Sequence, residues 1–172
     1  MNAIIVEGYL LDTSVASAVF DKGNPYHSAV RNNLEQLGEG IVYICPISIG
    51  EVEYGLKAAP SIDSDRQLIV RDAMAQYECL DIQRYTGEPY SSIRANLFKK
   101  YSPKNRRNRL ISKRVEDLIE PTTGKELGID ENDLWIVSTA IEYNLIFITR
   151  DQKGSMKRII EAANYTSRTL YW

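Results

Sequence analysis

The alternation of apolar and polar positions is most regular between Ile129 and Asp151, where it predicts a helix followed by a buried strand. Apolar residues recur at helical spacing after Asp130, a candidate N-cap, and Asn144 is a candidate helix end. The next four residues, 145–148, are all apolar, which is typical of a strand covered on both faces. A polar segment ends that strand and places the acid of Asp151 directly after it.

The rest of the chain also alternates between short apolar runs and amphipathic segments. Further strands are predicted at 8–11, 41–45, 78–82 and 169–172, the last at an edge, and residues 4–6 belong to the first strand or lead into it. The expected helices span 15–20 (capped by Thr13 or Ser14), 25–38, 47–56, 63–77, 89–101 and 110–119. This alternation predicts right-handed crossovers and a mostly parallel central sheet of four to five strands, covered on both faces.

Length and composition fit a single domain over residues 1–172. The chain is 44% hydrophobic and 26% charged, as is ordinary for a globular domain. No apolar run approaches the roughly 20 residues of a membrane span, and the N-terminus lacks the basic region of a secretory signal. Cys45 and Cys79 have no metal-ligand spacing, so we expect buried, reduced thiols in a cytoplasmic protein.

The net charge of −2 hides a strongly basic segment. Between Lys99 and Arg114 there are eight basic residues and no acid, so the remainder of the chain has a formal charge of −10, that is, −2 minus 8. An acidic body with one basic segment can bind a polyanion locally. The eight residues are Lys99, Lys100, Lys104, Arg106, Arg107, Arg109, Lys113 and Arg114.

Four acids are predicted to meet at one edge of the sheet. Asp12 follows the first strand, Asp151 follows the strand at 145–148, and Glu51 and Asp133 lie near helix starts. In parallel sheets, ligands bind beyond the carboxyl ends of the strands, where the crossover helices begin. Each acid alone has a duller explanation as a helix cap, a first-turn acid or a turn former. The evidence for a functional site is therefore that all four acids are predicted at the same edge of the sheet.

Carboxylates crowded in this way repel one another, which raises their pKa values or destabilises their surroundings. Mg²⁺ or Mn²⁺ removes the conflict, because these ions prefer carboxylate oxygens and water and can also bind a phosphate. One or two such ions can orient and deprotonate water and neutralise charge at phosphorus. This chemistry needs no histidine. A two-histidine nuclease, a His-rich zinc site and most Ser-His-Asp triads are hard to build with His27 alone.

Four segments resemble the PIN-domain ribonucleases, and specifically the VapC-type toxins of bacterial toxin–antitoxin pairs. They are YLLDTSV at 9–15, ISIGEVEYGL at 47–56, ENDLWIVSTA at 131–140 and LIFITRD at 145–151. This resemblance implies that Asp133, rather than Asp130, is the aspartate of the Asn-Asp pair that opens the family's penultimate helix. It implies a catalytic and metal-binding quartet of Asp12, Glu51, Asp133 and Asp151. It also places two small hydroxyls, Ser14 and Thr149, where they would support the acids or a metal-bound water.

The resemblance further implies a three-layer α/β/α PIN-like domain that acts as a metal-dependent endoribonuclease, with Mg²⁺ or Mn²⁺ as the cofactor and RNA as the substrate. It implies a homodimer that is inhibited by a small antitoxin protein encoded beside the toxin. No membrane is expected to take part.

The region from Tyr101 to Gly128 departs from the family, because it is longer and more basic than the usual connection before the ENDLW helix. We expect a basic helical insertion at about 101–128. It could be a solvated insertion that pairs with the acidic body, a surface that follows the phosphates of RNA through the eight basic residues, or a holder for an acidic antitoxin tail. Tyr101 could stack on a base, although a tyrosine on an apolar helical stripe is more often part of the core.

Three functions stay open on sequence alone. The first is the metal-dependent endoribonuclease. An aspartyl-phosphate phosphatase with Asp12 as nucleophile would usually have an acid two residues later, where this chain has Ser14. A non-catalytic PIN-like module that binds RNA or a protein would be favoured by a missing acid, and none of the four is missing.

Overall fold

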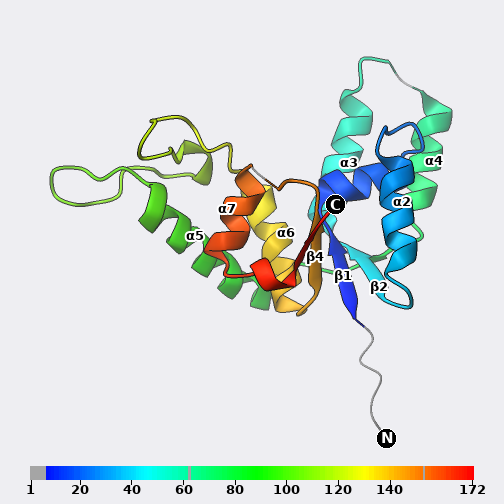
Figure 1. Cartoon of the computed structure of the whole chain (residues 1–172). Coiled ribbons are helices and arrows are strands. Elements are labelled where there is room, and N and C mark those ends of the chain that lie inside the picture. Colours follow the sequence, from blue (N-terminus) through cyan, green and yellow to red (C-terminus); the bar gives the residue numbers. More distant parts are fainter. Residues whose placement is uncertain (1–6, 62, 153) are drawn as a thin grey trace, which may run out of the picture.

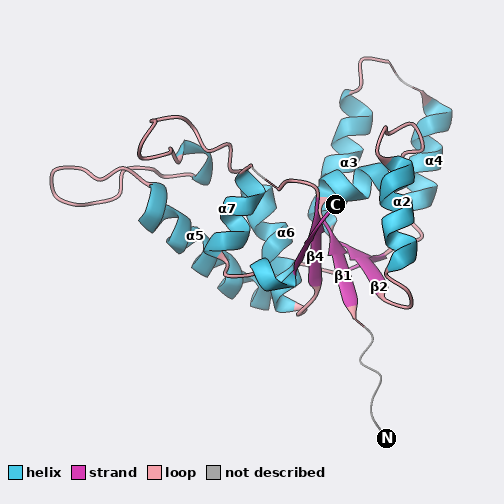
Figure 2. Ribbon diagram, in the orientation of Figure 1, coloured by secondary structure: helices cyan, strands magenta, loops and turns pink. Residues whose placement is uncertain are grey.

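The computed structural model describes residues 7–61, 63–152 and 154–172, and its centre is a five-stranded sheet with helices on both faces (Figures 1 and 2). Each pair of neighbouring strands is parallel. This confirms the predicted α/β class with a sheet more uniformly parallel than expected. The strand order is β3-β2-β1-β4-β5, where β1 is Gly8–Leu11, β2 Ile41–Ile44, β3 Glu78–Cys79, β4 Ile146–Thr149 and β5 Thr169–Tyr171.

The helices form two layers that bury the sheet between them, as the three-layer prediction requires (Figure 1). Successive strand residues point to opposite faces. Leu10 and Phe147 accordingly pack in one apolar cluster, while Leu11 and Ile148 pack in the other. One layer contains α1 (Thr13–Phe20), α2 (His27–Gln36), α3 (Pro46–Ala58) and α4 (Ser64–Met74); the other contains α5 (Gly87–Tyr101), α6 (Glu131–Glu142) and α7 (Ser155–Ala162).

The helix and strand predicted between Ile129 and Asp151 are present as α6 and β4. The carboxylate of Asp130 caps α6 by accepting a hydrogen bond from the amide of Asn132 at 2.8 Å. Asn144 ends the helix in the left-handed region, with φ of 53°, and the following amide of Leu145 donates to a helix carbonyl at 2.8 Å. This is the geometry of a helix C-terminus that closes its free carbonyls and turns at once into a strand.

Some local predictions were wrong. Helix α1 begins at Thr13, so Asp12 rather than Thr13 or Ser14 occupies the N-cap position. Cys79 is exposed, in contrast to the buried Cys45. Residues 4–6, the proposed lead-in to β1, lie outside the described residues. None of the described helices has the length and apolar character needed to cross a membrane.

The helix expected at 110–119 is absent from the segment between α5 and α6, all of which is described. Residues 102–130 contain instead a 3₁₀ turn at Val115–Asp117 and two isolated antiparallel bridges, one between residues 104 and 110 and one between 119 and 126. Val115 and Leu118 are buried, whereas Leu110 and Ile111 are exposed. Side chains three positions apart align on a 3₁₀ turn as well as on an α-helix. The apolar spacing alone therefore did not distinguish the two.

Candidate metal centre

The parallel pairing of β1 and β4 brings two acids to the same edge of the sheet. Asp12 directly follows β1, and its backbone amide donates to the carbonyl of Ile148 in β4 at 2.9 Å. Asp151 lies two residues beyond the end of β4. The other two acids are in crossover helices: Glu51 in the second turn of α3 and Asp133 in the first turn of α6.

Asp12 is buried, with 5% of its surface exposed, and hydroxyl groups surround its carboxylate. Ser14 Oγ and Thr149 Oγ1 both donate to Asp12 Oδ2, at 2.7 and 2.9 Å. Burial raises the pKa of the Asp12 carboxyl, while these hydrogen bonds act in the opposite direction. The hydroxyls of Ser14 and Thr149 therefore oppose part of the effect of burial, although the pKa of Asp12 stays raised.

Glu51 connects the two helical layers. Its Oε1 accepts a hydrogen bond from Asn132 Nδ2 at 2.8 Å, across a separation of 81 residues, and its Oε2 accepts one from Thr13 Oγ1. Asn132 precedes Asp133 in α6, so this contact fixes the start of α6 against α3. Sequence reasoning identified Asn132 only as the neighbour of Asp133 and missed Thr13, because neither pattern nor spacing reveals a hydrogen bond between distant side chains.

Asp133 lies in the electric field of the other acids. Its pKa is raised to about 8, first by burial and then by the negative charges of Asp12, Asp130, Glu51 and Asp151. A charge must be near for its effect on a pKa to be resolved. The structure thus brings Asp12, Glu51 and Asp151 near enough to Asp133 for their charges to act on its pKa.

The carboxylate of Asp151 accepts hydrogen bonds at the start of α7. The amide of Gly154 donates to Oδ1 at 2.6 Å and the amide of Met156 donates to Oδ2 at 3.3 Å. A side-chain Cβ at position 154 would collide with this carboxylate, so the close approach requires glycine. The amide of Asp151 itself donates to Thr149 Oγ1 at 3.2 Å, which links Asp151 to the hydroxyl that holds Asp12.

The four acids are the kind of ligand that a hard divalent cation prefers, but the structure does not place them around one point. Among the described residues, no three Asp, Glu, His or Cys side chains are close enough to hold a metal ion between them. The donor set is nevertheless all carboxylate, which suits Mg²⁺ or Mn²⁺, and the pKa of Asp133 is raised by burial and by the neighbouring acids.

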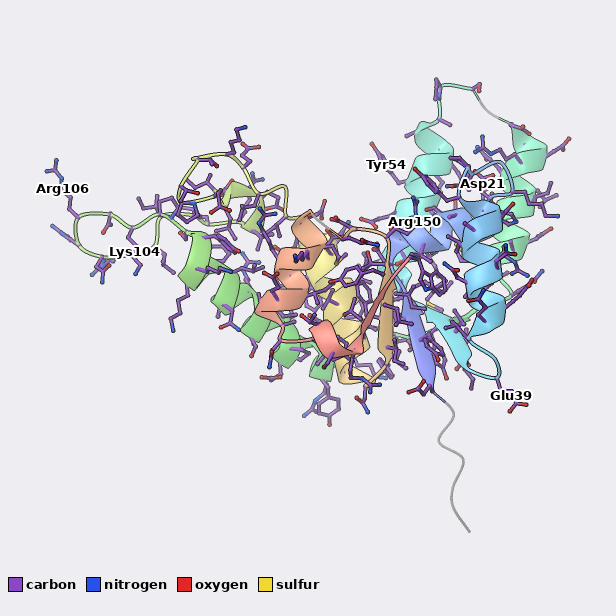
Figure 3. The ribbon with its side chains drawn as sticks, in the orientation of Figure 1. Asp21, Glu39, Tyr54, Lys104, Arg106 and Arg150 are labelled. Carbon is purple, nitrogen blue, oxygen red and sulfur yellow. The ribbon has the colours of Figure 1, made fainter. Side chains whose placement is uncertain are left out.

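The eight predicted RNA-binding residues do not form one patch at the acidic centre. Lys99 and Lys100 lie at the end of α5, where the Lys100 ammonium is 4.9 Å from the centre of the Tyr101 ring. Tyr101 is buried in the core and is not free to stack on a base. The middle of the segment projects from the body, as Figure 3 shows at Lys104 and Arg106.

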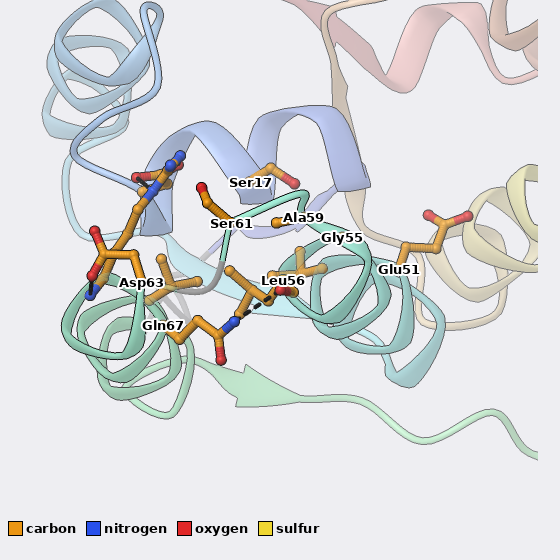
Figure 4. Close-up of a pocket in the computed structure, with 12 residues that line it drawn as sticks. Ser17, Glu51, Gly55, Leu56, Ala59, Ser61, Asp63 and Gln67 are labelled. Carbon is orange, nitrogen blue, oxygen red and sulfur yellow. Dashed lines mark hydrogen bonds and ion pairs between the residues drawn. The ribbon is translucent and has the colours of Figure 1, made fainter.

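A pocket of about 220 Å³ lies beside the centre, but the acids do not converge in it. It is lined by residues of α1, α3 and α4, among them Leu56, Gln67 and Val70, and Glu51 stands at its margin. Figure 4 shows the Glu51 carboxylate pointing away from the pocket. The pocket is therefore separate from the candidate metal centre.

The fold and these acids define a class of protein: a three-layer α/β/α domain with a cluster of carboxylates at the carboxyl edge of a parallel sheet. The family model of the PIN domain matches residues 9–161. The chain belongs to the PIN domain family, as its four sequence segments indicated. The comparison with curated proteins gave no match.

Solved structures share the fold at low sequence identity. A chain in the crystal structure of VapBC2 from Rickettsia felis, bound to a DNA fragment from their promoter, is 22% identical with a TM-score of 0.60, and the match covers 88% of this chain and 92% of that one. A chain of FitAcB from Neisseria gonorrhoeae is 23% identical with a TM-score of 0.57, and the match covers 88% of this chain and 92% of that one. VapBC-5 from Mycobacterium tuberculosis is a member of the VapBC family of toxin–antitoxin systems. A chain of its structure is 19% identical with a TM-score of 0.56, and the match covers 95% of this chain and 96% of that one.

The raised pKa of Asp133 predicts that this carboxylate destabilises the metal-free fold. Its pKa is about 8 in the folded protein against an ordinary 3.8, so the folded state retains a proton that the unfolded chain releases, and stability falls as the pH rises between those values. Asp133→Asn should therefore raise the free energy of unfolding at pH 8 in EDTA by at least about 1 kcal/mol. Urea unfolding would measure the difference.

Asp72→Asn, which removes an exposed charge from α4, is the matched control and should change stability little. The gain from Asp133→Asn should shrink as the pH falls towards 3, because the wild-type carboxyl is then mostly protonated in the unfolded chain (ordinary pKa 3.8) as well as in the folded protein. Adding Mg²⁺ should stabilise the wild type more than the variant. An Asp133→Asn protein no more stable than the wild type at pH 8 would contradict the repulsion inferred at this centre.

Proposed function

We propose that this protein is a VapC-type toxin: an endoribonuclease that hydrolyses RNA phosphodiester bonds with the help of Mg²⁺ or Mn²⁺. The observation that supports this most directly is the placement of Asp12, Glu51 and Asp151 near Asp133, whose pKa is raised first by burial and then by the charges of these acids and of Asp130. In a PIN domain, a group of carboxylates that repel one another at the carboxyl edge of the sheet is best explained as a site built for a cation.

The proposed roles follow from the contacts. Asp12, Glu51, Asp133 and Asp151 would hold the cation, which when bound supplies an activated water and offsets negative charge at the phosphorus. Ser14 and Thr149 would orient the buried Asp12 carboxylate, and their hydrogen bonds oppose part of the rise in its pKa that burial causes. Asn132 and Thr13 orient Glu51, so that the acids of the two layers face the same space.

A cognate antitoxin is the proposed protein partner, and a homodimer the proposed assembly. The antitoxin is supported by the similarity of this fold to chains of VapBC toxin–antitoxin complexes, and the homodimer by the resemblance of the four sequence segments alone. Co-expression with the product of the neighbouring open reading frame should give a complex that copurifies and lacks nuclease activity, and light scattering of the protein alone should give twice the chain mass. A monomer, or no complex with that product, would refute the respective part of this proposal.

A non-catalytic PIN-like module that binds RNA or a protein is the second candidate. It is favoured by one observation: no three acids among the described residues are yet close enough to enclose a metal ion. The two candidates differ in turnover, because such a module would bind RNA without cleaving it under any divalent metal.

Replacing Asp12 with asparagine tests the proposal directly. Asp12→Asn keeps the shape of the side chain but removes the buried charge, so the cleavage of total RNA in Mg²⁺ or Mn²⁺ should fall to the level of buffer alone. Circular dichroism would check that the fold is retained, and Asp72→Asn should remain active. Full activity of Asp12→Asn, or of the wild type in excess EDTA, would refute the proposed mechanism.

The hydroxyl of Thr149 offers a finer test. Thr149→Val removes the donor to Asp12 without changing the side-chain shape, and the loss of a group that orients a metal-binding residue typically lowers activity about 10–100-fold. Thr149→Ser retains the hydroxyl and should keep most of the activity. Because the lost hydrogen bond favoured ionised Asp12, the pH profile of Thr149→Val should also move to higher pH. Equal activities and profiles for both variants would show that the hydrogen bond plays no part.

A further inference from the structure

The segment 103–111 is an ordered hairpin, which we call the basic arm. Its two strands are joined by hydrogen bonds from the amide of Asn105 to the carbonyl of Arg109 and from the amide of Ile111 to the carbonyl of Pro103, both at 2.9 Å. The side chain of Asn105 accepts from two amides of the turn, and Asn108 adopts a left-handed φ of 59°. The side chains of the arm are thus displayed from a defined backbone.

The basic arm has positive charges without partners inside the protein. Four of its side chains are cationic and exposed, and none forms an ion pair with a described residue: Lys104, Arg106, Arg107 and Arg109. Arg114 differs, because it pairs with Asp117 at 3.1 Å. Lys99 and Lys113 are also exposed and in no ion pair among the described residues, but they lie outside the hairpin. The arm is therefore where four such cations gather within six residues.

Two arginines of the helices contact both the chain that follows the arm, at Lys113 and Glu120, and residues next to the acidic centre. Arg94 in α5 donates to the carbonyl of Lys113 at 3.1 Å and to the carboxylate of Glu131 at 2.6 Å, and Glu131 is two residues before Asp133. On the other side, Arg158 in α7 pairs with Glu120 at 3.6 Å and donates to the carbonyl of Gly154 at 3.2 Å. Gly154 is the residue whose amide holds Asp151.

We propose that the basic arm binds the phosphate backbone of single-stranded RNA and holds it beside the acidic centre. This inference rests on the proposed nuclease function for the identity of the polyanion. Three of the four free cations are arginines, whose planar guanidinium groups match phosphate oxygens in pairs. A ligand that contacts both the arm and a phosphodiester-cleaving centre must be a nucleic acid. The rest of the protein, with a formal charge of −6, that is, −2 minus 4, would repel such a ligand.

Binding can be measured separately from cleavage in the Asp12→Asn background. The probe is a fluorescein-labelled, mixed-sequence single-stranded RNA, titrated by fluorescence anisotropy between about 50 and 200 mM KCl. The arm variant replaces its four cations with glutamine: Lys104→Gln, Arg106→Gln, Arg107→Gln and Arg109→Gln. The matched control makes the same charge change on the body: Lys22→Gln, Arg31→Gln, Lys57→Gln and Arg84→Gln.

The arm variant should bind the RNA at least about 10-fold more weakly at the lowest salt, and the slope of log K against log salt should lose about 2–3 units, since each phosphate contact to a single strand contributes about 0.7. The control should keep a slope within about one unit of the parent, because scattered body charges release few counterions. Thermal unfolding of all variants would check that the arm changes leave the fold intact.

An arm variant with the affinity and salt slope of the parent would overturn the proposal. So would an arm variant that keeps RNA binding but loses binding of a labelled polyglutamate peptide, because the arm would then be a site for an acidic protein segment. The proposed nuclease function fails by a different result: a wild-type protein that binds RNA through its arm yet never cleaves it with Mg²⁺ or Mn²⁺.

Discussion

The arrangement of the site depends on keeping like charges together at one edge of a sheet. Parallel pairing of β1 and β4 places Asp12 and Asp151 near each other whatever their charge. The repulsion is opposed mainly by neutral donors: the hydroxyl of Thr149, the amide of Asn132 and the backbone amides at the start of α7. Neutral donors stabilise a carboxylate without cancelling its charge. The pKa values of Asp12 and Asp133 nevertheless stay raised, so under the proposed function a bound cation would be needed for these acids to ionise together.

The separation of charge along the chain complements this centre. An acidic body is a poor surface for RNA, and a cluster of carboxylates is worse, so a nuclease of this design needs its substrate held from elsewhere. The basic arm places cations on a projecting hairpin, and Arg94 and Arg158 connect the root of its segment to the elements that bear Asp133 and Asp151. Under the two proposals, RNA binding and RNA cleavage would therefore belong to distinct parts of one domain.

Sequence reasoning predicted the elements whose periodicity is unambiguous. The apolar run of β4 and the helical spacing of α6 specified both elements, and Asp130 and Asn144 marked the ends of α6 because cap residues have local chemistry. The insertion was mispredicted as helical because the spacing of Val115 and Leu118 suits a 3₁₀ turn equally well. The contact of Asn132 with Glu51 was out of reach, since it depends on the packing of two helices 81 residues apart.

The four acids are divided equally between the two halves of the chain. Asp12 and Glu51 belong to the N-terminal half, whose helices α1–α4 form one layer, while Asp133 and Asp151 belong to the C-terminal half with α5–α7. Neither half contains the complete set, and β1 meets its partner β4 only after most of the polypeptide has been synthesised. A nascent or truncated chain therefore lacks the assembled centre, and the hazardous chemistry of the proposed toxin arises only with the finished domain.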